Sequence, residues 1–141
     1  MKPGCYTALA TPFTPDGLRI DQRGLEQLID FQIANGITGI LAVGTTGESP
    51  TLGWSEHNAV GDSVARLCRD HCLSIAGAGS NNTQEALNAT AHAVKRQVDA
   101  VLLVDPYYNG PSSLEIRREY VAPIAARFPG ITLTGSFGYA S

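Results

Sequence analysis

Five short apolar segments recur along this chain at intervals of roughly thirty residues, a spacing typical of successive strand–helix units. They occupy residues 6–10, 40–43, 73–76, 100–104 and 131–134. Each segment is short and rich in aliphatic side chains, as strands buried within a parallel sheet are. The order predicts an α/β fold in which helices connect parallel strands by right-handed crossovers.

The segments between these strands have the periodicity of amphipathic helices. Four groups of residues each define one helical face that can pack on a sheet. They are Leu25, Leu28, Ile29 and Ile33; Val60, Val64, Leu67 and Cys68; Leu87, Thr90, Ala91 and Val94; and Ile116, Tyr120, Ile124 and Phe128. Helix starts are predicted at the N-caps Asp21 and Ser55, and at two pairs with capping-box spacing, Asn82 with Glu85 and Ser112 with Glu115.

Two architectures agree with this order of elements, an open doubly wound sheet and part of a (β/α)8 barrel. A complete barrel typically needs ~250 residues, whereas this chain has 141. No linker, repeat or charge run divides the chain, so a single domain over residues 1–141 is expected. The Gly- and Ser-rich segment after residue 133 begins where a further helix is expected, which indicates a truncated architecture.

Composition argues against several classes of partner. The formal net charge is −3 and the pI is about 5.5, which leaves no basic field for nucleic-acid phosphates or an anionic membrane. The N-terminus lacks the apolar stretch of a signal peptide, and no segment has the ~20 apolar residues of a membrane span, so a cytoplasmic location is expected.

The sequence has three cysteines, Cys5, Cys68 and Cys72, and this odd, small number favours reduced thiols. Together with His57 and His71 they do not form the paired ligand pattern of a metal site.

The segment Gly44-Thr45-Thr46-Gly47-Glu48 directly follows the second predicted strand. It therefore lies at the carboxyl end of that strand, where the active sites of α/β folds are found. Two adjacent hydroxyls between glycines provide N–H and O–H donors on a backbone that can turn sharply. This pattern predicts a loop that holds a small anion such as a carboxylate.

Three further polar loops follow other predicted strands and are expected to face the same edge of the sheet. They comprise residues 11–12, 77–82 and 105–109. In the last of these, Tyr107 and Tyr108 are interpreted either as packing at the rim or as a proton relay. The loop at residues 77–82 suggests phosphate binding at a helix N-terminus, but the third glycine of a dinucleotide fingerprint is missing.

Read together, residues 11–13, 44–48 and 106–109 resemble the 4-hydroxy-tetrahydrodipicolinate synthases. These belong to the pyruvate-dependent class I aldolases, which include N-acetylneuraminate lyase. The resemblance extends from about Cys5 to about Pro129, and the paired threonines favour the synthase branch. It implies a partial (β/α)8 TIM barrel, with the first four βα units and a fifth strand.

The resemblance also implies an activity and site residues. The family is a lyase that condenses pyruvate with L-aspartate 4-semialdehyde in lysine and diaminopimelate biosynthesis, without a cofactor or metal and as a homo-oligomer. Thr45 and Tyr108 match catalytic relay positions, and Thr45 and Thr46 match positions that hold the carboxylate of pyruvate. The positions of an allosteric lysine pocket correspond to Ser49, His57, Asn81, Glu85 and Tyr107, with Trp54 nearby.

One departure from the family pattern limits this reading. These enzymes form a Schiff base between pyruvate and a lysine on the sixth strand, whereas the only lysines here are Lys2 and Lys95. The relay tyrosine of the fifth-strand motif is not matched, and spacing does not assign that role to Tyr139. We therefore expect a chain that is inactive alone. Two alternatives stay open: a non-catalytic fragment that binds a small acid or a partner, and an open-sheet phosphate-binding domain.

Overall fold

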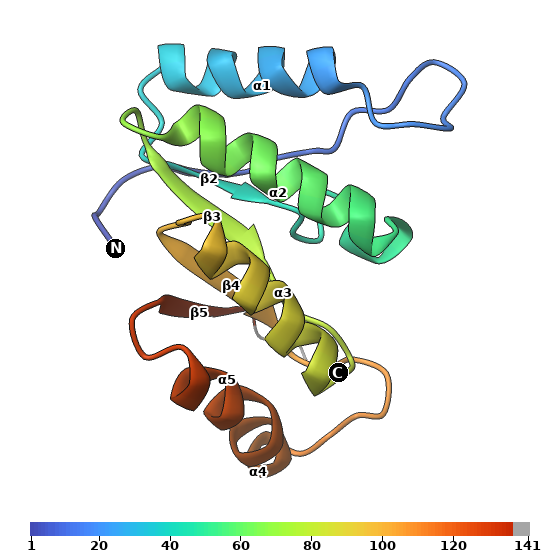
Figure 1. Ribbon diagram of the computed structural model, residues 1–141, viewed down its shortest axis with the longest axis vertical. Helices are drawn as coiled ribbons and strands as arrows, with labels where there is room; N and C mark the ends of the chain where they lie inside the picture. Colours follow the sequence, from blue (N-terminus) through green and yellow to red (C-terminus); the bar gives the residue numbers. More distant parts are fainter. Residues whose placement is uncertain (137–141) are drawn as a thin grey trace.

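A parallel five-stranded sheet forms the centre of the computed structural model, which describes residues 1–136 (Figure 1). The strands follow one another in chain order, β1-β2-β3-β4-β5, and every neighbouring pair is parallel. Their bounds are β1 (Tyr6–Ala8), β2 (Gly39–Ala42), β3 (Leu73–Gly77), β4 (Ala100–Val104) and β5 (Thr132–Ser136). The five apolar segments predicted as strands are therefore confirmed.

Helices connect the strands and pack against one face of the sheet (Figure 1). The three long helices are α1 (Gln22–Ala34), α2 (Trp54–Cys68) and α3 (Thr83–Lys95). A short 3-10 helix, η1 (Ser49–Thr51), precedes α2. The fourth connection contains α4 (Ser113–Glu115), the π-helical segment η2 (Ile116–Val121) and α5 (Ala122–Arg127).

The strand order decides between the two predicted architectures. A doubly wound sheet reverses its strand order at a switch point and carries helices on both faces, whereas this sheet keeps chain order and carries them on one. That arrangement is the geometry of successive units in a (β/α)8 barrel. The prediction of a partial barrel is confirmed, and the open doubly wound sheet is wrong.

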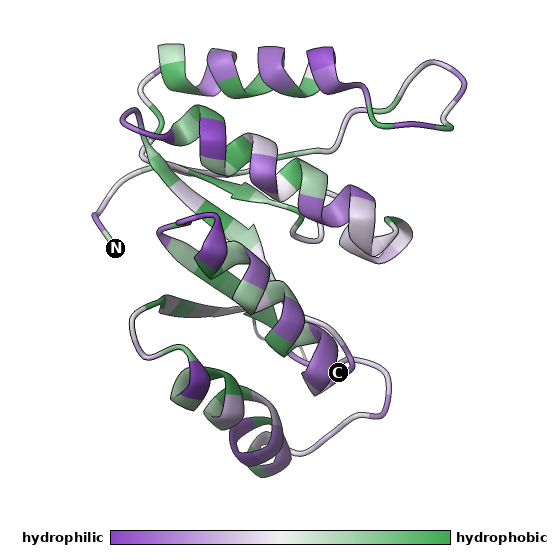
Figure 2. Ribbon diagram, viewed as in Figure 1, coloured by the Kyte–Doolittle hydropathy of each residue, from purple (hydrophilic) through white to green (hydrophobic). Residues whose placement is uncertain are grey.

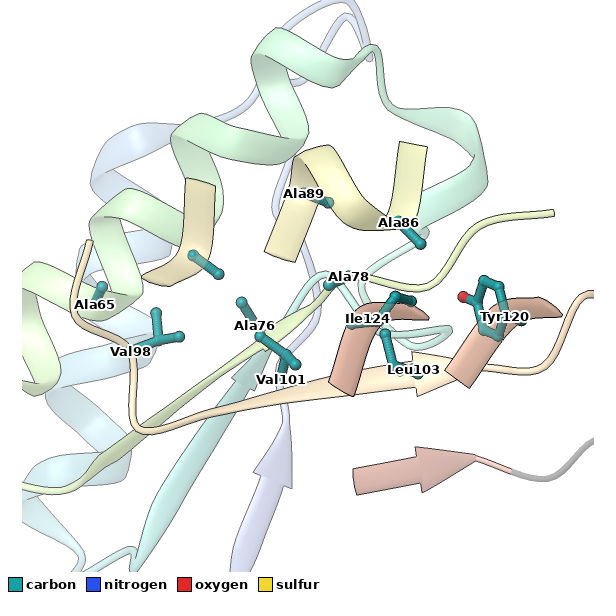
Figure 3. Close-up of a cluster of buried hydrophobic side chains, with 11 residues drawn as sticks. Ala65, Ala76, Ala78, Ala86, Ala89, Val98, Val101, Leu103, Tyr120 and Ile124 are labelled. Carbon is teal, nitrogen blue, oxygen red and sulfur yellow. The ribbon is translucent and has the colours of Figure 1, made fainter. Parts of the chain in front are cut away.

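Two hydrophobic clusters fill the layer between sheet and helices. In the first, Ile40 and Ala42 of β2 pack with buried residues of α1 and α2, such as Leu25 and Val64. In the second, side chains of β3, β4 and α3 meet Tyr120 and Ile124 of the fourth connection (Figure 3). The helices show both hydrophilic and hydrophobic residues along their length, whereas β2, β3 and β4 are mostly hydrophobic (Figure 2).

Local sequence rules predicted most helix starts. Asp21 caps α1 by accepting from the N–H of Gly24, and the capping box of Ser112 with Glu115 is present. Ser55 is not an N-cap but the second residue of α2, which begins at Trp54 with Gly53 in the cap position. The carboxylate of Glu56 instead accepts from the N–H of Gly53 at 3.1 Å.

The remaining capping-box prediction is half right. Asn82 does cap α3, accepting from the N–H of Gln84, but Glu85 turns away and accepts from the hydroxyl of Ser80.

The last predicted helix is continuous in space but widens into a π-helical turn before Pro123. Proline has no N–H to donate four residues back, and the freed carbonyl of Glu119 accepts from the Thr83 hydroxyl at 3.1 Å.

Candidate active site at the carboxyl edge of the sheet

The loop after β2 turns sharply because two residues adopt left-handed backbone conformations. Val43 has φ +48° and Glu48 has φ +57°, and this region is strained for a β-branched side chain. Short hydrogen bonds close the turn: the N–H of Gly47 donates to the carbonyl of Gly44, and that of Glu48 to the carbonyl of Thr45. Within residues 1–136 the backbone N–H groups of Thr45 and Thr46 have no backbone acceptor, so both remain available to a ligand.

Tight contacts hold the strained turn in place. A Cβ at Gly77 of β3 would lie 2.8 Å from the carbonyl carbon of Val43, so only glycine permits this approach. Gly47 packs as closely, since a Cβ there would lie 3.0 Å from the carbonyl oxygen of Leu9 and 3.1 Å from the Cα of Val43. The buried hydroxyl of Thr11 then donates to the carbonyl of Gly47 at 2.7 Å.

The loops after β3 and β4 are tied to each other through one side chain. The Asn81 side-chain oxygen accepts from the N–H of Tyr107 at 2.7 Å and from that of Tyr108 at 3.1 Å. The N–H of Ser80 donates to the buried hydroxyl of Tyr120 at 3.0 Å. These hydrogen bonds fix the two loops to each other, and their position relative to the loop after β2 is set by the β2, β3 and β4 register.

These three loops surround a cavity of about 640 Å³ at the carboxyl edge of β2, β3 and β4. Its floor includes Leu102 and Val104 of β4. Thr45 lines it, together with all five residues matched to the effector pocket and Trp54. The lining set singled out by sequence is thus Thr45, Ser49, Trp54, His57, Asn81, Glu85 and Tyr107. Among residues 1–136, Glu85 is the one charged residue in the lining.

His57 lies at the inner wall of this cavity and is only 5% exposed. Its ring contacts that of Trp54, with 4.9 Å between the ring centroids. The pKa of His57 is lowered from 6.5 to about 4, mainly because the ring is buried. A hydrogen bond with Asn58 raises the pKa in part, and charge repulsion from His92 lowers it further. The imidazole is therefore neutral at pH 7, and its Nε2 is buried without a hydrogen-bond partner among the described residues.

Comparison with known proteins identifies this architecture. Residues 1–131 match the model of the dihydrodipicolinate synthetase family. The chain belongs to this family. A 4-hydroxy-tetrahydrodipicolinate synthase from Acidiphilium cryptum is 46% identical over 119 residues, and one from Methanocaldococcus jannaschii is 45% identical over 117. The aligned parts cover 84% and 83% of this chain but 40% of each relative.

Solved structures of the family give the same picture. A dihydrodipicolinate synthase from Cyanidioschyzon merolae with lysine bound superposes with a TM-score of 0.89 at 38% identity, covering 94% of this chain and 44% of that one. An Acinetobacter baumannii synthase complexed with pyruvate gives 0.86 at 38% identity, with the same coverage. This chain therefore spans about 40% of the length of its curated relatives, and its fold is the corresponding part of their barrel.

Two residues singled out by sequence lie apart from the cavity. Thr46 is exposed and Tyr108 is 82% exposed, and neither lines it. Tyr108 instead borders a smaller groove of about 170 Å³ that contains Glu115 and Glu119. Tyr139 lies outside the described residues.

The two lysines also lie away from the cavity. Lys95 is the exposed last residue of α3, at the opposite edge of the sheet, and Lys2 precedes β1.

Within residues 1–136 no group of three or more His, Cys, Asp or Glu side chains is arranged to hold a metal ion. In the same part of the chain, none of the helices is both long enough and apolar enough for a membrane span.

Sequence reasoning missed the groups that hold the site in shape. Thr11 was recognised only as part of a polar loop, although its hydroxyl supports the turn that carries Thr45. Ser80, which donates to Glu85, was not singled out. A lone Thr gives no signal of such a role, because Gly47 lies 36 residues away and is brought close by the pairing of β1 with β2. The Ser80 contact is local, but the capping-box spacing with Asn82 assigned Glu85 to another partner.

Proposed function

We propose that this chain provides the carboxylate-binding part of a 4-hydroxy-tetrahydrodipicolinate synthase site. One observation carries the proposal: the strained turn after β2 presents Thr45 to a cavity at the carboxyl edge of a partial barrel. Active sites of (β/α)8 enzymes lie at that edge. In this role the Thr45 hydroxyl and N–H donate to the carboxylate of pyruvate. The free N–H of Thr46, which adjoins the cavity without lining it, is proposed as a further donor.

The reaction proposed for the site is condensation of pyruvate with L-aspartate 4-semialdehyde. That step needs an amine nucleophile, because imine formation is what activates pyruvate as a carbon nucleophile at neutral pH. Neither Lys2 nor Lys95 lies in the cavity. We therefore assign the Schiff-base lysine to a segment outside these 141 residues, and we expect the chain alone to bind but not to catalyse. In the proposed relay, Tyr108 acts with Thr45 once its exposed ring is covered by a neighbouring subunit.

The cavity has a second proposed role as an effector site for lysine. Glu85 supplies a negative charge that suits an ammonium group, and Asn81 and Ser49 add neutral polar groups. The unpartnered Nε2 of buried His57 provides a further hydrogen-bonding position, and burial of such a group without a partner is costly. The superposed Cyanidioschyzon merolae synthase has lysine bound.

The phosphate-binding alternative is less well supported. Three N–H groups of the loop at residues 77–82 donate to partners within the protein: that of Ala78 to Leu102, that of Ser80 to Tyr120 and that of Asn82 to the Ser80 hydroxyl. A phosphate site needs such donors free and convergent. Glu85 beside this loop would also repel a phosphate.

A trapping experiment tests the division of roles between this chain and the missing segment. The protein is incubated with pyruvate and borohydride, and mass spectrometry is used to look for a reduced adduct. We expect none on this chain alone, and an adduct on the partner when a polypeptide with the later βα units of a synthase is added. A pyruvate adduct on Lys2 or Lys95 of the isolated chain would contradict the assignment.

A further inference from the structure

A pair of thiols lies where α2 leads into β3. Cys68 is the last residue of α2, and Cys72 directly precedes β3. The N–H of Cys72 donates to the carbonyl of Cys68 at 3.0 Å, which closes one turn between the two residues. Cys68 is a fully buried member of the first hydrophobic cluster, and Cys72 is partly buried against the same cluster. Both side chains therefore lie on the same side of the connection.

The spacing of the two residues suits an intramolecular disulfide. Cα atoms one hydrogen-bonded helical turn apart are separated by about 6 Å, and disulfides join Cα atoms roughly 4.4–6.8 Å apart. The segment between the cysteines lies outside the helix, since Arg69 is the C-cap and Asp70 has a left-handed backbone with φ +67°. All three intervening residues are exposed, so the turn can tighten without disturbing the core.

The two thiols have different environments, which suits them to different steps of thiol–disulfide exchange. Cys72 is partly exposed, so a dissolved disulfide can reach its sulfur, whereas Cys68 is completely buried. Burial raises the pKa of the Cys68 thiol, and so do the hydrogen bond and charge of Cys72 and the negative charge of Asp99. Since the thiolate is the nucleophile, Cys72 is the thiol that reacts first and Cys68 the one that resolves the product.

We propose that Cys68 and Cys72 form a thiol–disulfide exchange site for small-molecule disulfides such as glutathione disulfide. The Cys72 thiol loses its proton and attacks one sulfur of the oxidant, which breaks the S–S bond, forms a mixed disulfide and releases a thiolate that takes up the proton. The Cys68 sulfur then attacks that of Cys72, and its proton leaves with the second small thiol. Two protein thiols are thereby oxidised, and the small disulfide is reduced to two thiols.

This site is separate from the ligand cavity. It lies at the amino edge of the sheet, because Cys72 precedes β3, whereas the cavity lies at the carboxyl edge. Oxidation joins the end of α2 to the start of β3 and uses none of the groups assigned to ligand binding. The proposal therefore does not depend on the proposed function.

Treatment of the intact, reduced chain with glutathione disulfide tests the proposal. Remaining thiols are alkylated, and mass spectrometry of the monomer and of its tryptic peptides locates each disulfide. Trypsin cleaves after Arg66 and Arg69, so Cys68 and Cys72 lie on different peptides, and a bond between them joins the two. We expect this linked pair as the main product, in a monomer that has lost two hydrogen atoms at these residues.

Three variants separate the roles of the thiols. In Cys68→Ala no internal thiol displaces glutathione from Cys72, so that adduct should accumulate at least about tenfold over the wild type. In Cys72→Ala the buried Cys68 should stay unmodified. Cys5→Ser is the matched control, because it removes the exposed cysteine outside the pair and should leave the linked peptides unchanged.

Circular dichroism of every variant establishes that the helices are retained. A folded wild-type chain that forms no Cys68–Cys72 bond, or only a lasting glutathione adduct on Cys72, would overturn the proposal. A folded Cys72→Ala chain in which Cys68 is oxidised as readily as in the wild type would overturn it as well.

Discussion

Replacing Gly77 by alanine probes the contact that fixes the turn carrying Thr45. The added Cβ would lie 2.8 Å from the carbonyl carbon of Val43, closer still to its oxygen, and 3.2 Å from the carbonyl oxygen of Ala42. Real Cβ atoms essentially never come within 3.0 Å of another atom. Because the opposing atoms are backbone, no side-chain rotation relieves the clash, and the strand end and turn must move apart.

Overpacking of this kind typically costs 1–3 kcal/mol, and the rigid backbone on both sides places Gly77→Ala at about 2–3 kcal/mol. For a chain of this length that corresponds to a fall in melting temperature of roughly 6–12 °C. Calorimetry measures the stability, and a titration monitored by the fluorescence of Trp54, the one tryptophan, measures ligand binding. We expect both the melting temperature and the affinity for pyruvate to fall.

Gly61→Ala is the matched control, because a Cβ at Gly61 within α2 meets no atom within 4 Å. Alanine is favoured over glycine inside a helix by up to ~1 kcal/mol, so this variant should be slightly more stable and bind pyruvate normally. A Gly77→Ala protein that melts within about 2 °C of the wild type and binds pyruvate equally well would refute the reasoning.

Three further predictions concern single side chains. Thr11→Val removes the buried hydrogen bond to Gly47 without changing shape, and it should lower the free energy of unfolding in urea by about 1–3 kcal/mol, whereas Thr11→Ser should retain most of it. Because the folded-state pKa of His57 is lowered to about 4, the unfolded chain binds a proton first as pH falls below 6.5. Stability present at pH 7 should therefore decline by roughly 2–3 kcal/mol as the pH approaches 4, and urea titrations of His57→Asn should show a flatter decline. Glu85→Gln removes the charge in the cavity and should weaken lysine binding, measured by Trp54 fluorescence, about tenfold; unchanged affinity would exclude Glu85 as an ammonium partner.

The sequence predicts the elements well because they depend on local patterns. The fourth strand is predicted with its observed bounds, Ala100–Val104, since an uninterrupted aliphatic run leaves little choice. Residue patterns alone could not choose between an open sheet and a barrel, because they do not say on which side of the sheet each helix packs. The missed cap at Gly53 has a different, local origin: glycine has no side chain that signals a cap, and Glu56, three residues later, supplies the contact.

The site was predictable in part. Thr45, which lines the cavity, was singled out because its loop follows a recognisable strand and contains two hydroxyls between glycines. The strain at Val43 and the support from Thr11 were not, because both depend on how β1, β2 and β3 approach one another. The single isolated chain also leaves Tyr108 exposed, so its proposed role depends on a partner that local sequence does not describe.

The central claim is that the turn after β2 holds a small keto acid through Thr45. Saturation-transfer NMR with pyruvate and the intact chain tests it directly, with Thr45→Val as the variant that keeps the shape but removes the hydroxyl. We predict transfer to the pyruvate methyl group in the wild type and a strong reduction in the variant. No transfer in the folded wild type, or equal transfer in both proteins, would contradict the account.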